Sequence, residues 1–196
     1  HPDADHIGGF ADVLRRYEVS AFISPGIGKD TATFRELEAT IVAQKVPRVV
    51  VQRGTVLELG GGARLEVLYP DHDVSTLASS KTNDGCIVAR LTYGETSAIL
   101  ACDAPAFVES RVVALEESLD SDILKVAHHG SRYSSTENFI QAVSPEVAII
   151  SVGKNSYGHP TEQTLDVLNR HGAQVLRTDQ EGTVVCTSNA LQFTCE

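Results

Sequence analysis

The chain begins His1-Pro2-Asp3-Ala4-Asp5-His6-Ile7-Gly8-Gly9, and four of its first six side chains can bind a metal ion. If residues 1–5 are extended, the two-residue period of a strand places His1, Asp3 and Asp5 on one side of the backbone. His6 then follows at the turn into an expected helix. Imidazole and carboxylate without thiolate suit Zn²⁺ or Mn²⁺ and argue against a structural zinc knuckle. The alternative is a flexible polar terminus or a purification-tag remnant. The choice between a metal site and this alternative depends on the residues further along the chain.

The bulk composition is that of an ordinary globular protein with an acidic balance. At 196 residues, 42% hydrophobic and 21% charged, the chain is expected to form one domain spanning residues 1–196. Its 16 Lys and Arg against 26 Asp and Glu give a net charge of −10, and no basic run marks a nucleic-acid surface. A polyanionic substrate would need bound cations to attract it; the alternative is an acidic protein with no polyanion partner. No apolar stretch reaches the roughly 18 residues of a membrane span, so we expect no membrane insertion by this segment.

Hydrophobic periodicity predicts a mixed α/β chain without internal repeats or linkers. Helices are expected over residues 10–17, 31–44, 106–119, 136–143 and 162–171. Strands are expected over residues 19–24, 48–52, 55–59, 64–69, 86–93, 97–101, 122–127, 147–152, 174–177, 183–187 and 191–195. Residues 70–85 are rich in Asp, Ser, Thr and Asn, which predicts a loop.

Candidate ligands follow three of the predicted strands. Asp103 comes after the strand at 97–101, His128 and His129 end the strand at 122–127, and His159 lies in the loop after 147–152. In layered α/β folds, sites are assembled at such strand ends. Taken singly, Asp103 is more often a helix cap and His159 a hydrogen-bonded loop residue. Their joint occurrence with the amino-terminal motif favours one metal site.

The four cysteines show no metal-ligand spacing. Cys86, Cys102, Cys186 and Cys195 each lie in an apolar, strand-like run, which favours buried free thiols. A Cys186–Cys195 bridge across a terminal hairpin is the alternative if the domain faces an oxidising compartment. Cysteine usage therefore leaves the compartment open.

The residues at 1–9 resemble the His-x-His-x-Asp-His signature of the metallo-β-lactamase superfamily. The second His is replaced by Asp3, a variant typical of the carboxy-terminal domain of ComEC-type competence (DNA-uptake) proteins. The resemblance continues through Asn83-Asp84-Gly85-Cys86, Asp103, Leu124-Lys125-Val126-Ala127-His128-His129-Gly130-Ser131, Ser151-Val152-Gly153, the Asn155 to Pro160 loop and Arg177-Thr178-Asp179. It covers nearly the whole chain in the expected order. The family's Gly-Asp pair is Cys102-Asp103 here and its usual Ser is Cys86, small-for-small changes that the fold should tolerate.

The resemblance implies a fold and a ligand set. The expected fold is the αββα sandwich of the superfamily, an α/β (α+β) architecture, lacking its first amino-terminal strands, which would lie upstream. Asp5 and His6 would hold one ion with His128 or His129, with a preference for His128; His1 and Asp3 would hold the other, and Asp103 would bridge the two. Asp5 and His159 are the expected catalytic residues, His159 as a proton donor or phosphate contact. Supporting or substrate-contacting roles would fall to five residues: His129, Ser131, Asn83, Asn155 and Tyr157. For Ser131, Asn155 and Tyr157, loop stabilisation is an equal alternative. The superfamily's third-motif His has no clear counterpart, and Asn83 lies nearest that region.

The resemblance also implies a function. Two divalent ions, Mn²⁺ or Zn²⁺, would activate a hydroxide that cleaves DNA phosphodiesters, degrading the non-transported strand during uptake. The expected partners are DNA, in single-stranded form, and the transmembrane channel portion of a bacterial membrane protein, with this domain on the extracytoplasmic side. The alternatives are a small-molecule phosphodiesterase or lactonase of the same fold, or a catalytically inactive, metal-stabilised interaction module. The sequence cue for single-stranded DNA is a groove lined by aromatic and basic residues. Only Arg132-Tyr133 and Lys154 with Tyr157 indicate such a groove.

Overall fold

A computed structural model describes all 196 residues, and its centre is a seven-stranded sheet in the order β3-β4-β5-β6-β7-β8-β9. Strands β3 to β6 pair antiparallel and β6 to β9 pair parallel. The strands are β3 (Val56–Gly60), β4 (Ala63–Tyr69), β5 (Val88–Tyr93), β6 (Thr96–Leu100), β7 (Ile123–Lys125), β8 (Val147–Ile150) and β9 (Gln174–Arg177). The parallel half matters for the site, because its strands all end at one edge of the sheet.

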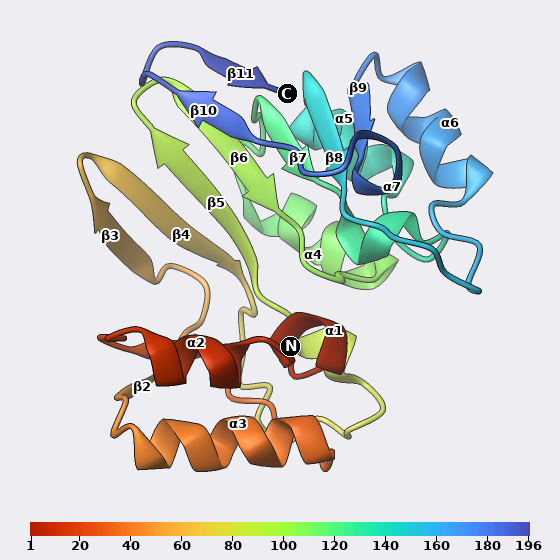
Figure 1. The fold of residues 1–196 in the computed structure, drawn as a ribbon. Helices are drawn as coiled ribbons and strands as arrows, with labels where there is room; N and C mark the ends of the chain where they lie inside the picture. Colours follow the sequence, from red (N-terminus) through yellow and green to blue (C-terminus); the bar gives the residue numbers. More distant parts are fainter.

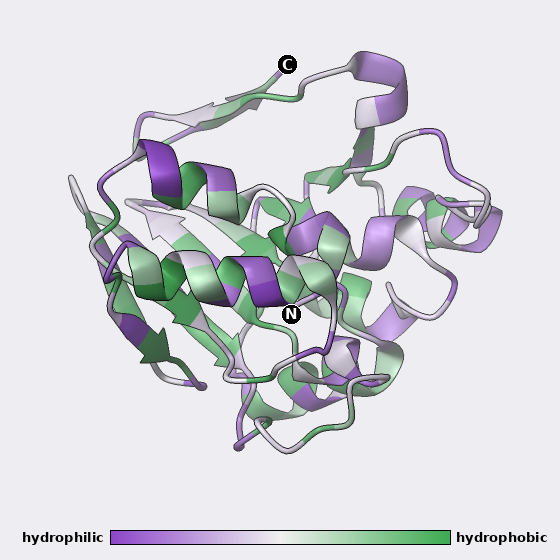
Figure 2. Ribbon diagram, turned by 60° about the horizontal axis from the view of Figure 1, so that its bottom comes forward, coloured by the Kyte–Doolittle hydropathy of each residue, from purple (hydrophilic) through white to green (hydrophobic).

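One face of the parallel half is covered by helices (Figure 1). These are α4 (Ala106–Leu115), α5 (Glu137–Val143) and α6 (Glu162–Arg170), each of which connects two neighbouring parallel strands. Ile99, Leu124 and Ile150 point to this face from three adjacent strands and are fully buried there. Leu100, which alternates with Ile99, is exposed on the opposite face. In Figure 2 the strands are mostly green, as expected for a sheet that supplies the main core.

A smaller layer forms from the amino-terminal third. It contains α1 (Ala4–Ile7), α2 (Phe10–Arg16), α3 (Ala32–Ala43) and a parallel pair, β1 (Phe22–Ser24) with β2 (Arg48–Val50). Its own hydrophobic cluster is Ile7, Leu14, Leu37 and Ile41. Thr31 caps α3 by accepting a hydrogen bond from the Phe34 N–H. Figure 1 shows this layer beside the ends of β4 and β5, with the amino terminus turned toward the sheet.

The last part of the chain forms α7 (Thr178–Glu181) and an antiparallel hairpin, β10 (Cys186–Ser188) with β11 (Phe193–Cys195). The hairpin contacts β6 through the Thr96 and Ser188 hydroxyls, whose oxygens are 2.7 Å apart. The favoured prediction of free thiols is wrong for Cys186 and Cys195, which form the disulfide that was the alternative, whereas Cys86 and Cys102 are free. None of the helices combines the length and apolar composition that a membrane span needs.

The mixed α/β architecture predicted from the sequence is confirmed, and each expected helix and strand has a counterpart. One expectation is wrong: residues 1–5 do not form an extended segment. The N–H groups of His6 and Ile7 both bond to the Asp3 carbonyl at 2.9 Å, so the helix α1 begins at Ala4. Asp3 and Asp5 therefore do not share one side of a strand. The turn of helix is stabilised by burial of Ile7, a contact with the distant α3 that local spacing does not reveal.

Candidate metal centre

Four segments meet at the carboxyl edge of the parallel strands. His1 and α1 approach from the small layer, and Asp103 follows β6 in the loop that leads to α4. The two adjacent histidines lie in a short 3₁₀ turn, η2 (Ala127–Gly130), directly after β7. His159 lies in the loop that follows β8. Parallel strands thus bring side chains from remote parts of the sequence to one place, as such sheets commonly do.

The first group of candidate ligands has nitrogen and oxygen donors. One donor atom from each of Asp5, His6, Asp103 and His129 lies within 4.8 Å of all the others. His129 Nε2 is 3.2 Å from Asp5 Oδ2, and His6 Nε2 is 3.2 Å from Asp103 Oδ1. Three of the four side chains are at least partly buried, and Asp5 is exposed at the mouth. Such a set suits a divalent cation.

His129 is oriented as metal-binding histidines usually are. Its Nδ1 lies 2.7 Å from the carbonyl oxygen of Ser151. A carbonyl can only accept, so Nδ1 carries the proton, and Nε2 faces the Asp5 and Asp103 carboxylates, where a bound cation would take its lone pair. His128 and His129 have φ values of 49° and 55°, a left-handed backbone that L-residues rarely adopt. Such strain persists where the surroundings fix it, and it is concentrated at functional sites.

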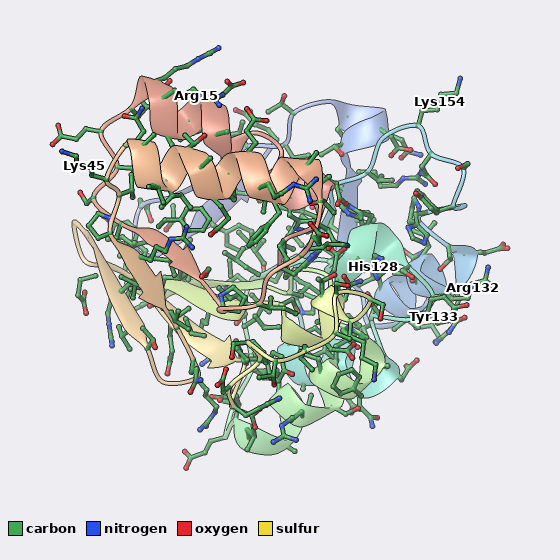
Figure 3. The ribbon with its side chains drawn as sticks, turned by 90° about the horizontal axis from the view of Figure 1, so that it is seen from below. Arg15, Lys45, His128, Arg132, Tyr133 and Lys154 are labelled. Atoms are coloured by element: carbon green, nitrogen blue, oxygen red, sulfur yellow. A yellow bond between two sulfur atoms is a disulfide. The ribbon has the colours of Figure 1, made fainter.

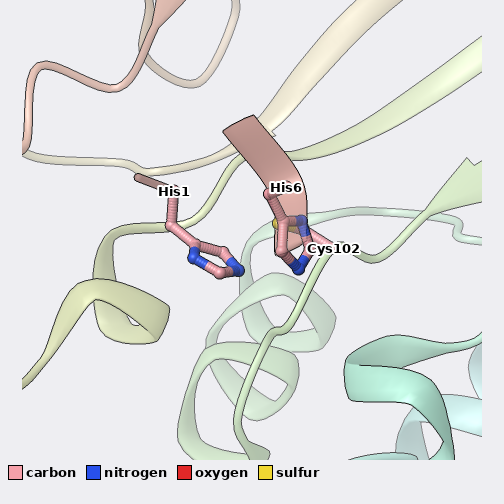
Figure 4. A group of neighbouring side chains, drawn as sticks. All are labelled: His1, His6 and Cys102. Atoms are coloured by element: carbon pink, nitrogen blue, oxygen red, sulfur yellow. The ribbon is translucent and has the colours of Figure 1, made fainter. Parts of the chain in front are cut away.

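The second group consists of His1, His6 and Cys102, whose donor atoms also lie within 4.8 Å of one another (Figure 4). The His1 and His6 rings are 4.0 Å apart between centroids. The His1 side chain is 0% exposed, and neither of its nitrogens has a hydrogen-bond partner; the same holds for Nε2 of His6. Buried nitrogens without partners are rare in proteins. A cation bound here would give them one, so these residues fit a metal ion.

The charges of the centre are paired around the buried Asp103 carboxylate. Burial would raise the pKa of Asp103, but the neighbouring His1 and His6 outweigh it and hold this pKa far below its usual range. Burial would lower the pKa of His1, but the Asp103 carboxylate and the Cys102 thiol raise it to about 10. The same two groups overcome burial to raise the pKa of His6 to about 9. The carboxylate is thus ionised and holds positive charge around it.

Two of the predicted ligands lie outside both groups. Asp3 Oδ1 accepts hydrogen bonds from the Lys29 ammonium and the Thr82 hydroxyl, each at 2.7 Å. Burial alone would raise the pKa of Asp3, but the Lys29 and Thr82 bonds lower it, so its charge is already balanced. His128 Nε2 is 3.8 Å from Asp103 Oδ2, and its ring packs edge-on against His159 at 5.7 Å. The structure therefore brings His129, rather than His128, into the first group.

Residues 1–154 match the profile of the metallo-beta-lactamase superfamily. The chain belongs to this superfamily. It is 37% identical over 186 residues to ComE operon protein 3 of Bacillus subtilis (strain 168), covering 94% of this chain and 23% of that protein. It is 37% identical over 113 residues to Competence protein ComA of Neisseria gonorrhoeae, covering 57% of this chain and 15% of that protein. It is 29% identical over 188 residues to Recombination protein 2 of Haemophilus influenzae (strain ATCC 51907 / DSM 11121 / KW20 / Rd), covering 94% of this chain and 21% of that protein.

The resemblance to ComEC-type competence proteins is thereby confirmed, and the chain spans less than a quarter of the length of these relatives. The large mixed sheet with its helical layers is consistent with the metallo-β-lactamase fold. Membership of the superfamily implies binding of divalent metal, and the two groups described above contain possible donors for it.

The remaining predicted residues surround this metallo-β-lactamase centre. Asn155 uses its whole side chain inside its own loop: its Nδ2 donates to the Gly153 and His159 carbonyls, and its Oδ1 accepts from the Tyr157 and His159 N–H groups. Tyr157 is exposed and stacks on His159. Loop stabilisation is therefore what Asn155 does in the structure. Two further residues belong to neither ligand group: Ser131, which is buried and accepts a hydrogen bond from the Tyr133 N–H, and Asn83, which lies half-buried in the 3₁₀ helix η1 (Thr82–Gly85).

Two residues near the metallo-β-lactamase ligands were not predicted from the sequence. Lys29 neutralises Asp3 across 26 positions, and nothing in its neighbourhood of the chain indicates this pairing. Cys102 was interpreted as a buried free thiol, although its position beside Asp103 was the available signal. Ligand spacing within one segment cannot reveal donors that a fold brings from another segment.

Proposed function

We propose that this chain is a divalent-metal-dependent phosphodiesterase domain that cleaves DNA, within a ComEC-type DNA-uptake protein. The observation that carries the proposal is the convergence of Asp5, His6, Asp103 and His129 around one point, with His129 oriented by Ser151. Names of two relatives, a competence protein and a recombination protein, support DNA as the substrate class. Degradation of the non-transported strand is the role that we assign to it.

Asp103 is our proposed bridging ligand. Its Oδ1 is 3.2 Å from His6 Nε2, and its Oδ2 is 3.5 Å from His1 Nε2, so one carboxylate faces both ligand groups. We assign Asp5 and His129 to one ion and His1 and His6 to the other. We assign to His128 a contact with the substrate rather than with the metal. The ions, Mn²⁺ or Zn²⁺, would make water acidic near neutral pH and offset the negative charge of the attacked phosphate.

His159 is our proposed contact to the leaving group or a phosphate oxygen. Burial lowers its pKa, and the nearby His128 and His129 lower it further. It is therefore neutral near pH 7 and can donate an N–H hydrogen bond to a phosphate without carrying charge. Proton donation would require the bound phosphate to raise this pKa. Tyr157 stacks on its ring and limits its orientation.

The surface next to the centre supports single-stranded DNA as the substrate. Tyr133 and Tyr157 are 69% and 79% exposed, so their rings are free to stack on bases. Arg132 lies over the Tyr133 ring at 5.9 Å. Figure 3 places Arg132, Tyr133 and Lys154 on the side of the molecule that carries His128. We expect Arg132 and Lys154 to lie along the path of a DNA strand that leaves the site. They would attract the strand locally in a protein whose net charge is −10.

We further propose that the domain lies outside the cytoplasm, next to the transmembrane channel of its parent protein. The Cys186–Cys195 disulfide supports this location, because such bonds persist in oxidising compartments.

A second candidate function, hydrolysis of a small phosphodiester or lactone, is favoured by one observation. A largely apolar cavity of about 240 Å³ adjoins His1 and His6 and is lined by Phe10, Phe22 and Phe34.

Cleavage of end-labelled single- and double-stranded DNA tests the proposal, in chelator and after restoring Mn²⁺, Zn²⁺ or Mg²⁺. Metal-dependent cutting that Asp103→Asn abolishes and Asp120→Asn, an exposed carboxylate, leaves intact is the expected result. Turnover of a chromogenic small phosphodiester or a lactone, with DNA left uncut, would move the assignment to the second candidate. Bound metal without turnover of any of these substrates would leave a metal-stabilised interaction module.

A further inference from the structure

We infer that Cys102 is a metal ligand, together with His1 and His6, and that the ion held there is one that prefers sulfur and nitrogen donors, such as Zn²⁺. The inference rests on the proposed metal centre but not on DNA as the substrate. Figure 4 shows the Cys102 sulfur beside the His6 ring, with the His1 ring turned toward both. The three donor atoms lie within 4.8 Å of one another. Donors around a tetrahedral zinc lie roughly 3.5 Å apart, so small side-chain rotations close the site.

His1 is the independent observation that points to a ligand. Its ring is 0% exposed, and both of its nitrogens lack hydrogen-bond partners. Asp3, which the family resemblance pairs with His1 on one ion, lies 3.5 Å from His1 Nδ1, but the same oxygen already accepts hydrogen bonds from Lys29 and Thr82. An ion on the His1 side therefore needs another donor. Cys102 is the side chain that the fold places there.

The backbone at Cys102 is unusual for a cysteine. Its φ is +51°, in the left-handed region where glycine is favoured and a Cβ is strained. Its carbonyl accepts a hydrogen bond of 3.0 Å from the His128 N–H, which fixes this turn against the neighbouring strand end. A strained residue held by its surroundings is a mark of a functional position. The conformation aims the sulfur at the two imidazoles.

Cys86 gives the sulfur a second partner. It is 0% exposed, and its thiol lies within hydrogen-bonding reach of Cys102. A donor behind a ligand atom orients that atom and tunes its strength toward the metal. Cys86 belongs to neither group of candidate ligands, so we assign it to positioning and not to ligation.

The two halves of the centre then differ in chemistry. The group of Asp5, His6, Asp103 and His129 offers only oxygen and nitrogen, which Mn²⁺ accepts as readily as Zn²⁺. The sulfur of Cys102 favours Zn²⁺ or Co²⁺ over Mn²⁺ and Mg²⁺. We therefore expect one position to select against Mn²⁺ and the other to tolerate it. His6 belongs to both groups, and because a neutral imidazole offers one lone pair, we assign it to the ion held by His1 and Cys102.

Titration of the full chain with Co²⁺ tests the inference, because a cobalt–thiolate bond gives a charge-transfer band in the near ultraviolet. The protein is used only when two free thiols are counted, as expected for Cys86 and Cys102. The wild type and Cys86→Ser should show the band. Cys102→Gly and Cys102→Ser should lose it while keeping the weaker visible bands of cobalt bound to nitrogen and oxygen. Zn²⁺ affinity at one position should fall by more than about tenfold in both Cys102 variants.

Far-ultraviolet circular dichroism of the metal-free variants verifies folding, and Cys102→Gly is chosen because glycine adopts this φ without strain. Cobalt bound without a sulfur band in the wild type would overturn the inference and leave the proposed metal centre intact. Unchanged Zn²⁺ affinity in both Cys102 variants would do the same. No cobalt binding at all would overturn both the inference and the proposed function.

Discussion

The buried carboxylate of Glu109 should hold the loop that carries the two adjacent histidines. Glu109 lies on α4 and is 1% exposed. Its Oε1 accepts a hydrogen bond from the Ser135 N–H at 2.6 Å, and its Oε2 accepts one from the Thr136 N–H at 2.8 Å. Thr136 is the N-cap of α5 but makes no capping bond with its own side chain. Glu109 therefore supplies the cap from another helix and fixes the segment that begins at His129.

The stability that Glu109 contributes follows from these two hydrogen bonds and from the burial of its charge. A hydrogen bond to a charged acceptor contributes about 1.5–3 kcal/mol, so two would contribute about 3–6 kcal/mol. Burial nevertheless raises the pKa of Glu109 against the effect of both bonds, so desolvation offsets part of that sum. We expect Glu109→Ala to lower the free energy of unfolding by about 3 kcal/mol near neutral pH, and Glu109→Gln, which keeps one acceptor, by about half as much.

The raised pKa also fixes the sign of the pH dependence. A carboxyl whose folded-state pKa is raised contributes stability that is fully present below its unfolded pKa of about 4.3 and is lost as pH rises through the folded pKa. Glutamine does not titrate. The stability difference between the wild type and Glu109→Gln should therefore narrow as pH rises above about 4.3.

Urea unfolding of the metal-free proteins, followed by far-ultraviolet circular dichroism over a pH series, measures both effects. Glu117→Ala removes an exposed carboxylate close to the end of the same helix and should change stability by less than about 0.5 kcal/mol. A loss below about 1 kcal/mol in Glu109→Ala, or a wild-type advantage that widens with pH, would refute this account of the cap.

Three other perturbations have defined outcomes. Gly130→Ala should destabilise the fold by at least about 2 kcal/mol in urea, because its Cβ would lie 2.5 Å from that of Pro160 and its φ is +83°; an unchanged unfolding curve would contradict this. Reducing the Cys186–Cys195 bond, which spans nine positions, should lower the free energy of unfolding by about 2–3 kcal/mol, and an unfolding midpoint insensitive to reductant would show otherwise. In an NMR titration of the metal-free protein the pKa of His159 should lie below 6.5, because burial and the neighbouring histidines lower it; a value at or above 6.5 would be the contrary result.

The secondary structure could be predicted because its signals are local. The apolar residues of α3 recur at helical spacing, and alternation along β6 separates buried Ile99 from exposed Leu100. The two-turn helix α2 and both terminal hairpin strands were found in the same way. The short helices α1 and α7 were missed, because four residues provide no period to detect.

The site could be predicted only to the level of its neighbourhood. Asp103 and the two adjacent histidines could be predicted from their positions after strands, because the carboxyl ends of parallel strands lie at one edge of the sheet. Which imidazole faces the carboxylates depends on the carbonyl of Ser151, 22 positions away from His129. The pairing of Asp3 with Lys29 spans 26 positions. Contacts of this kind are decided by packing, and a single sequence does not record them.

Three residues with a left-handed backbone explain how the centre can form before an ion binds. Cys102, His128 and His129 all adopt left-handed conformations at the ends of β6 and β7. Each such residue costs about 1–2 kcal/mol, so all three require compensation from their surroundings. The His128 N–H bonds to the Cys102 carbonyl at 3.0 Å, and this joins the two strand ends directly. The packing of the sheet thus compensates for this strain during folding. An ion would then bind donors that are already positioned, with little further loss of conformational freedom.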